Sequence, residues 1–85
     1  MIRITSVEIL NDYKLLLDWT NGERRIFDMS SELTGLFEEL RDRTLFEKVQ
    51  IEQGVLTWFR VNKMELDICP DYTYSKSICY SEFSD

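Results

Sequence analysis

The sequence predicts a small α+β domain: a mostly antiparallel sheet of two hairpins, with a central short helical segment and a short C-terminal helix. Apolar residues alternate with polar ones on both sides of Asn21-Gly22, and again on both sides of Gly54. Between these regions the apolar spacing changes to that of a helix. Short connections favour antiparallel pairing. Residues 1–85 are expected to form a single domain, with 81–85 as a frayed tail.

The N-terminal third predicts three antiparallel strands. The alternating runs cover residues 3–10, 13–20 and 23–29, with turn residues at 11–12 and 21–22. A change of phase near Thr5-Ser6 indicates a bulge in the first strand. Asn21-Gly22 predicts a type I′ turn, because both residues tolerate positive φ. The stretch LLLDWTNGERRIFD is therefore interpreted as a hairpin and not as a functional loop.

The middle of the chain predicts a helical segment. Apolar residues have the spacing i, i+3, i+4, i+7 at Leu33, Leu36, Phe37 and Leu40. Gly35 interrupts this stripe, so we expect either one weak helix over 31–41 or two short turns divided near Gly35. Candidate N-caps precede it at Asp28, Ser30 and Ser31. Asp42 is expected to cap a further turn over 45–47.

The C-terminal half predicts a second hairpin, a short strand and a helix. The strand runs cover residues 48–53, 55–60 and 65–68. Gly54 supplies the turn of the hairpin. Pro70 suits the first position of a helix, which is expected to continue to Ile78.

The charge balance disfavours polyanionic partners. The chain carries 16 acidic and 10 basic side chains, a net charge of −6. Nucleic acid and anionic membranes would be repelled at long range, so neither is expected as a direct partner. The N-terminal run MIRITSVEIL has no apolar signal-peptide core, which leads us to expect a cytoplasmic protein.

The residue types needed for common catalytic and metal sites are scarce. The chain has no histidine, and its two cysteines, Cys69 and Cys79, do not form a CxxC motif. We expect both to be reduced structural thiols, and we expect no metal or cofactor. The carboxylates Glu65, Asp67 and Asp71 match no cation-binding loop and are expected to be solvated or capping.

Two strands carry apolar residues on both faces. Leu16 lies opposite Leu15 and Leu17 in the alternation, and the neighbours Trp58 and Phe59 must point to opposite faces. Either the C-terminal helix or a partner therefore covers the second face. The candidate interaction surface is Leu16, Trp58, Phe59, Tyr72 and Tyr74.

Several stretches resemble a known family. Residues 17–28, LDWTNGERRIFD, resemble the Asn-Gly-Glu-x-Arg-x-Phe-Asp pattern of the bacterial domain of unknown function 2442 family. Residues 40–49 are similar to its "L-x-D…F…V" stretch, and 67–74 to its "D-I-x-P-D-x-x-Y" end. The chain departs from the family at 60–64, where RVNKM replaces a short Asn-Gly-type loop. The resemblance implies a compact α+β fold and a small cytoplasmic protein. Some such proteins are encoded beside others in arrangements that look like toxin–antitoxin pairs.

Two functions remain open at this point. The first is a non-enzymatic protein–protein interaction domain, antitoxin-like or adaptor-like, that binds a protein partner or self-associates as a homodimer. The second is a small ligand-binding module or enzyme that uses carboxylates and tyrosines in a cleft at the sheet edge. An exposed aromatic patch with flat surroundings would favour the first, and a cleft with a perturbed carboxylate the second.

Overall fold

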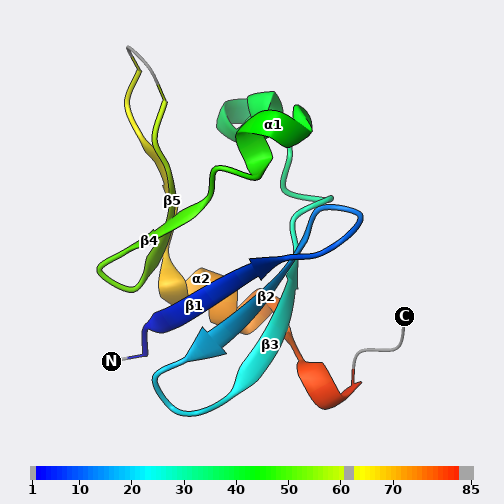
Figure 1. Cartoon of the computed structure of the whole chain (residues 1–85), viewed down its shortest axis with the longest axis vertical. Coiled ribbons are helices and arrows are strands. Elements are labelled where there is room, and N and C mark those ends of the chain that lie inside the picture. Colours follow the sequence, from blue (N-terminus) through cyan, green and yellow to red (C-terminus); the bar gives the residue numbers. More distant parts are fainter. Residues whose placement is uncertain (1, 61–62, 83–85) are drawn as a thin grey trace.

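Two antiparallel sheets pack around a common core in the computed structural model, which describes residues 2–60 and 63–82 (Figure 1). The first sheet has the order β1-β2-β3-β7 and the second the order β4-β5-β6. The first three strands are β1 (Ile4–Ile9), β2 (Lys14–Trp19) and β3 (Arg24–Asp28). These pairings confirm the predicted α+β class and the N-terminal hairpins. The register of β1 shifts between Ile4 and Ser6, which confirms the predicted bulge.

The turn at Asn21-Gly22 joins the predicted strands, but the predicted type I′ geometry is wrong. Gly22 has a φ of +87°, whereas Asn21 does not have a positive φ. Gly22 N donates to Trp19 O at 3.0 Å, and Trp19 N donates to Glu23 O at 3.0 Å. This is the pattern of a type I turn followed by a left-handed glycine. The Asn21 side chain stabilises it, because its Oδ1 accepts from Glu23 N at 3.0 Å.

The central segment is divided near Gly35, as the second predicted alternative describes. A turn after β3 is followed by the 3₁₀ helix η1 (Gly35–Arg41) and the single α-turn α1 (Arg43–Phe46). Asp28 does not cap a helix: its Oδ1 accepts from Ser30 N at 2.9 Å in that turn. Asp42 accepts from Thr44 N at 2.9 Å and caps α1, which confirms its predicted role.

The 3₁₀ geometry of η1 changes which side chains are buried. A 3₁₀ helix has three residues per turn, so side chains three apart share a face. Leu40 is buried, and Phe37, three residues before it, packs edge-on against Trp58. Leu36 falls outside that face and is 77% exposed. The predicted four-residue stripe is therefore wrong at Leu36.

The strands of the second sheet come in the predicted order along the chain, but the elements at the C-terminus differ from the prediction. Its elements are β4 (Gln50–Glu52), β5 (Val55–Trp58) and β6 (Leu66–Ile68), followed by the helix α2 (Pro70–Lys76). The helix ends before the predicted Ile78, and β7 (Ile78–Cys79) pairs with β3 instead. Part of the predicted frayed tail is ordered, because Ser81 lies in the 3₁₀ turn η2 (Tyr80–Glu82). The last three residues of the predicted tail lie outside the described residues.

The core lies between the two sheets and α2. Phe46 and Trp58 are both almost fully buried, and Trp58 Nε1 donates to Phe46 O at 3.0 Å. α2 lies behind β1 and β2 in Figure 1, and Tyr74 packs edge-on against Trp19 with ring centroids 5.2 Å apart. It therefore covers the core face of the first sheet and not the face of Leu16. No helix among residues 2–60 and 63–82 is long and apolar enough to cross a membrane.

Candidate functional site

The structure separates the five residues of the predicted interaction surface. Trp58 is 1% exposed, so it is a core residue and cannot contact a partner. Leu16 is 9% exposed and lies on the face of the first sheet opposite α2. Tyr72 and Tyr74 lie on α2, where Tyr72 is partly exposed and Tyr74 half-buried. Phe59, which follows β5, is 47% exposed.

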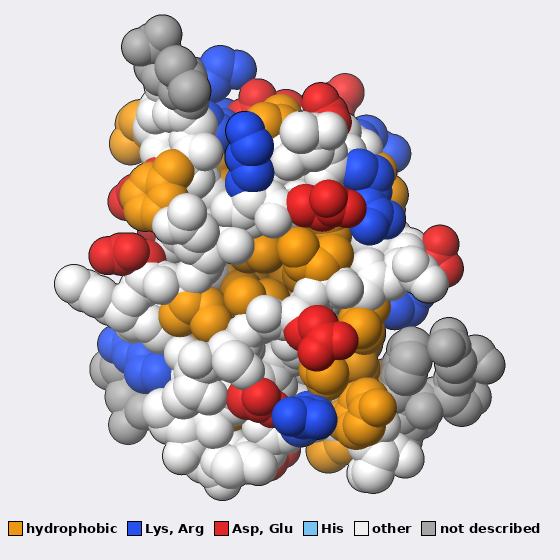
Figure 2. All heavy atoms as spheres, viewed as in Figure 1, with side chains coloured by type: hydrophobic (Ala, Val, Ile, Leu, Met, Phe, Trp, Pro, Cys, Tyr) orange, Lys and Arg blue, Asp and Glu red, His pale blue; other side chains and the backbone are white. Residues whose placement is uncertain are grey.

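The face of the first sheet opposite α2 is turned toward the viewer in Figure 1, and apolar side chains are visible in the middle of the same view in Figure 2. By register, Leu16 pairs with Ile26 and Ile26 with Ile78. Leu16 and Ile26 are already buried by their neighbours. Ile78 and Tyr80, at the β7 edge, are large apolar side chains that are about half exposed.

One carboxylate and one tyrosine meet beside the first hairpin, in a cluster that we call the α2 clamp: Glu23, Arg25, Tyr74 and Ser77. Glu23 accepts from the Tyr74 hydroxyl and from Arg25 Nη1, the latter at 2.9 Å. Arg25 also donates from Nε to Ser77 Oγ and from Nη2 to Ser77 O, both at 2.7 Å. Its guanidinium stacks 4.2 Å from the centre of the Tyr74 ring.

The electrostatics of the α2 clamp are those of a structural contact. The hydrogen bonds from Tyr74 and then Arg25 lower the pKa of the Glu23 carboxyl. The same bond to Glu23 raises the pKa of the Tyr74 phenol. An open hollow lies beside the clamp and is lined by Glu23, Arg24, Cys79, Tyr80 and Ser81. Glu23 belongs to both the clamp and this hollow, but its carboxylate is bonded to Tyr74 and Arg25, and the clamp fastens α2 to the first hairpin.

The other candidate groups are dispersed. Glu65, Asp67 and Asp71 are all exposed, and the described residues contain no group of three side chains able to hold a metal ion. Cys69 and Cys79 are both free. Cys79 Sγ lies 3.6 Å from Arg25 Nη1, at the margin of the α2 clamp.

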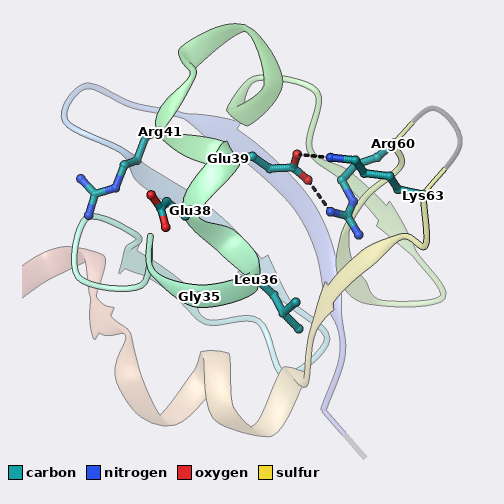
Figure 3. A pocket seen from close by; sticks show the side chains of 7 residues that line it. All are labelled: Gly35, Leu36, Glu38, Glu39, Arg41, Arg60 and Lys63. Carbon is teal, nitrogen blue, oxygen red and sulfur yellow. Dashed lines mark hydrogen bonds and ion pairs between the residues drawn. The ribbon is translucent and has the colours of Figure 1, made fainter.

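Among the described residues, the most exposed apolar side chains are Met64 and Leu36, and Leu36 lines a groove that extends across η1 to the β5–β6 hairpin (Figure 3). The groove is lined by Gly35, Leu36, Glu38, Glu39, Arg41, Arg60 and Lys63. An adjoining hollow shares Glu39, Arg60 and Lys63 and adds Leu45, Lys48 and Phe59. We call these two depressions together the hairpin groove. Its two sides come from segments more than twenty residues apart in the chain.

An ion-pair network bridges the hairpin groove. Glu39 points from η1 toward the hairpin, where one carboxylate oxygen accepts from Arg60 and the other lies 3.1 Å from Lys63 Nζ (Figure 3). Arg60 is 16% exposed, and its Nε also donates to Met64 O at 2.8 Å. The hydrogen bonds from Arg60 and Lys63 lower the pKa of the Glu39 carboxyl. The bridge therefore holds the two walls of the groove together.

Exposed apolar side chains and an excess of cations surround this bridge. Leu36 and Phe59 line the groove, and Met64 lies beside it as the carbonyl partner of Arg60; their exposures are 77%, 47% and 85%. Four cations and two carboxylates line the two depressions, a local balance of +2 in a chain of net charge −6. Sequence reasoning found only Phe59 here. The available signal was the departure from the family pattern at 60–64.

Comparison with known proteins identifies the family and no closer relative. A family model described as "Protein of unknown function (DUF2442)" matches residues 4–78. This span contains both hairpins, the central helical segment and α2. Comparisons with curated proteins and with solved structures gave no significant match.

Proposed function

We propose that this chain, which belongs to the DUF2442 family of proteins of unknown function, is a non-enzymatic protein–protein interaction domain. The hairpin groove is its contact surface. The family resemblance favours an antitoxin-like or adaptor-like role within that class.

One observation carries this proposal: large apolar side chains are exposed on η1 and on the β5–β6 hairpin, two of them in the lining of the groove. Leu36 and Met64 are each more than three-quarters exposed, and Phe59 is about half exposed. Burying such a side chain stabilises a complex by about 1.5–3 kcal/mol. Clustered exposed apolar groups rimmed by charge are typical of protein-binding surfaces, which are enriched in aromatic residues, Met and Arg.

The shape of the groove supports a protein partner over a small molecule. Small-molecule sites enclose about 70–90% of their ligand. The hairpin groove is open to solvent along its length. Its central carboxylate, Glu39, is held by Arg60 and Lys63 and is not free to act on a ligand.

The groove is not expected to bind the same groove of a second copy. Two copies that met groove to groove would bring together two regions of local charge +2, and like charges in contact oppose association. The occupant is therefore another protein, or a different face of a second copy.

Affinity capture from the native host tests this proposal. The tagged protein should retain a specific partner, and Leu36→Ser combined with Met64→Ser should abolish its capture. Both side chains are highly exposed, so the fold should be unaffected. Ile78→Ser is the matched control, because it removes a half-exposed apolar side chain at the far β7 edge. Equal capture by the wild type and the double variant would contradict the assignment of the groove.

A further inference from the structure

We propose that the hairpin groove binds an acidic segment of its partner, and that Glu39 occupies the position a partner carboxylate takes in the complex. This inference rests on the proposed function and adds the chemistry of the partner. Charge, cation geometry and the placement of the apolar side chains carry it.

The charge of the groove selects for an acidic partner. The groove has a balance of +2, while the whole chain carries −6, so its positive potential is local. A partner held by apolar contacts alone would gain nothing from these cations and would bear the cost of desolvating them. An acidic segment gains from both the cations and the apolar groups, and is drawn to this end of the molecule.

The Arg60 guanidinium is held in an orientation that allows it to bind a carboxylate. Its Nε and Nη2 both donate to the carbonyl of Met64, which fixes the guanidinium and leaves Nη1 directed at Glu39. A planar guanidinium held in this way loses little further freedom when it binds an anion. Lys63 reaches the same carboxylate and remains 58% exposed. Two cations therefore share the single carboxylate of Glu39, so they can also pair with a carboxylate of the partner.

The apolar side chains define the rest of the segment. Leu36, on η1, lines one of the two depressions that share the bridge residues, and Phe59, directly after β5, lines the other. A segment that spans the bridge would place carboxylates over Arg60 and Lys63 and apolar side chains against Leu36 and Phe59. The inferred partner sequence therefore combines Asp or Glu with large apolar residues.

Glu39 competes with this partner. Its carboxylate must be exchanged for the partner's at Arg60, so the intramolecular bridge lowers the apparent affinity. Removing its charge with Glu39→Gln should free Arg60 and tighten binding. Glu38→Gln is the matched control: it raises the charge of the same groove equally, but Glu38 lies on the other side of η1 and leaves the bridge in place (Figure 3).

A phage-displayed library of random peptides, selected on the wild-type protein, tests the inference. Enriched peptides should be acidic and carry large apolar residues. Measured by fluorescence anisotropy, their affinity should rise about 5-fold or more with Glu39→Gln and less than about 2-fold with Glu38→Gln. It should fall about 10-fold with Arg60→Gln. Lys63→Gln provides a second loss variant, because Lys63 is exposed and its replacement should not impair folding.

The failures of the two proposals are distinguishable. Enrichment of neutral apolar peptides that require Leu36 would overturn the acidic partner and leave the interaction surface standing. Absence of any peptide that requires Leu36 or Met64 would count against the surface itself. Arg60-dependent binding of a single-stranded oligonucleotide without acidic peptides would assign the groove to nucleic acid. Self-association of the Glu39→Gln variant in sedimentation would show that the groove binds a second copy of this chain and not a separate partner.

Discussion

At the scale of single residues, Gly54 joins the two sheets. It has a φ of +80° in the turn between β4 and β5, and its carbonyl accepts from Ile4 N at 3.0 Å. A Cβ atom placed on Gly54 would lie 2.5 Å from Arg3 Cβ. Both the backbone conformation and this close approach therefore require glycine.

Gly54→Ala should reduce the free energy of unfolding by about 2 kcal/mol or more, because backbone strain adds to the clash with Arg3. Gly22→Ala is the matched control. Gly22 also has positive φ, but no atom lies within 4 Å of its added Cβ, so about 1 kcal/mol of strain is expected. Urea unfolding measures both variants. Equal midpoints would show that the contact between the sheets contributes nothing.

At the scale of the elements, the α2 clamp determines how the chain ends. Arg25 on β3 holds Ser77 at the end of α2, and the backbone there becomes extended and pairs as β7. The contact joins residues 52 positions apart in the chain. A single arginine thus fixes both the end of a helix and the start of a strand.

Arg25→Met should destabilise the protein by about 1.5–3 kcal/mol, since hydrogen bonds to Ser77 and Glu23 are lost from a largely buried side chain. Arg24→Met is the control on the opposite face. Arg24 is 53% exposed and pairs with Asp18 in solvent, so its replacement should destabilise the protein less than Arg25→Met does. Chemical denaturation that ranks the two variants in reverse order would contradict the role of the clamp.

Locally encoded elements could be predicted from the sequence, and those that depend on distant contacts could not. Both hairpins, the bulge and the Asp42 cap follow from alternation and capping residues that act within a few positions. β7 was not predicted because its pairing with β3 and the bonds from Arg25 to Ser77 join positions far apart in the chain. The exposure of Leu36 was not predicted, because its spacing fits the buried face of an α-helix, whereas Gly35 begins a 3₁₀ helix.

At the scale of the whole molecule, carboxylates whose pKa values are lowered in the folded state determine how the free energy of unfolding changes with acid. The pKa values of Asp18, Glu23 and Glu39 are lowered, chiefly by hydrogen bonds from Arg24, Tyr74 and Arg60 respectively. Burial alone would raise the pKa of Asp28, but hydrogen bonds from Ser30 and the nearby Lys14 give a net lowering. A group with a lowered folded pKa stabilises the fold above its unfolded pKa, and that contribution is lost as pH falls through the folded value.

The free energy of unfolding should therefore stay nearly constant from pH 7 to about pH 5 and decline below about pH 4. Urea midpoints across this range check the expectation. Glu39→Gln should show a shallower decline than the wild type, because one of the contributing carboxylates is absent. A midpoint that rises or stays level below pH 4 would contradict this account.

The candidate site was the least predictable part of the molecule. Alternation places Trp58 and Phe59 on opposite faces but does not say which of them is buried, and only Phe59 proved to be on the surface. The cations and Leu36 could not be assigned to it, because the groove exists only where η1 and the β5–β6 hairpin meet. Such a juxtaposition depends on tertiary packing and leaves no periodic pattern in the sequence.

The α2 clamp and the hairpin groove differ in how they relate to the family pattern. Asn21, Glu23, Arg25 and Tyr74 belong to the pattern that marks the family, and here they shape the turn and fasten α2. The hairpin groove instead uses Arg60 and Lys63, which belong to the stretch 60–64 where this chain departs from the pattern. A chain that keeps these four residues would keep the turn and the docking of α2 even if its groove differed. Membership of the family therefore predicts the scaffold, and the partner has to be established for each protein separately.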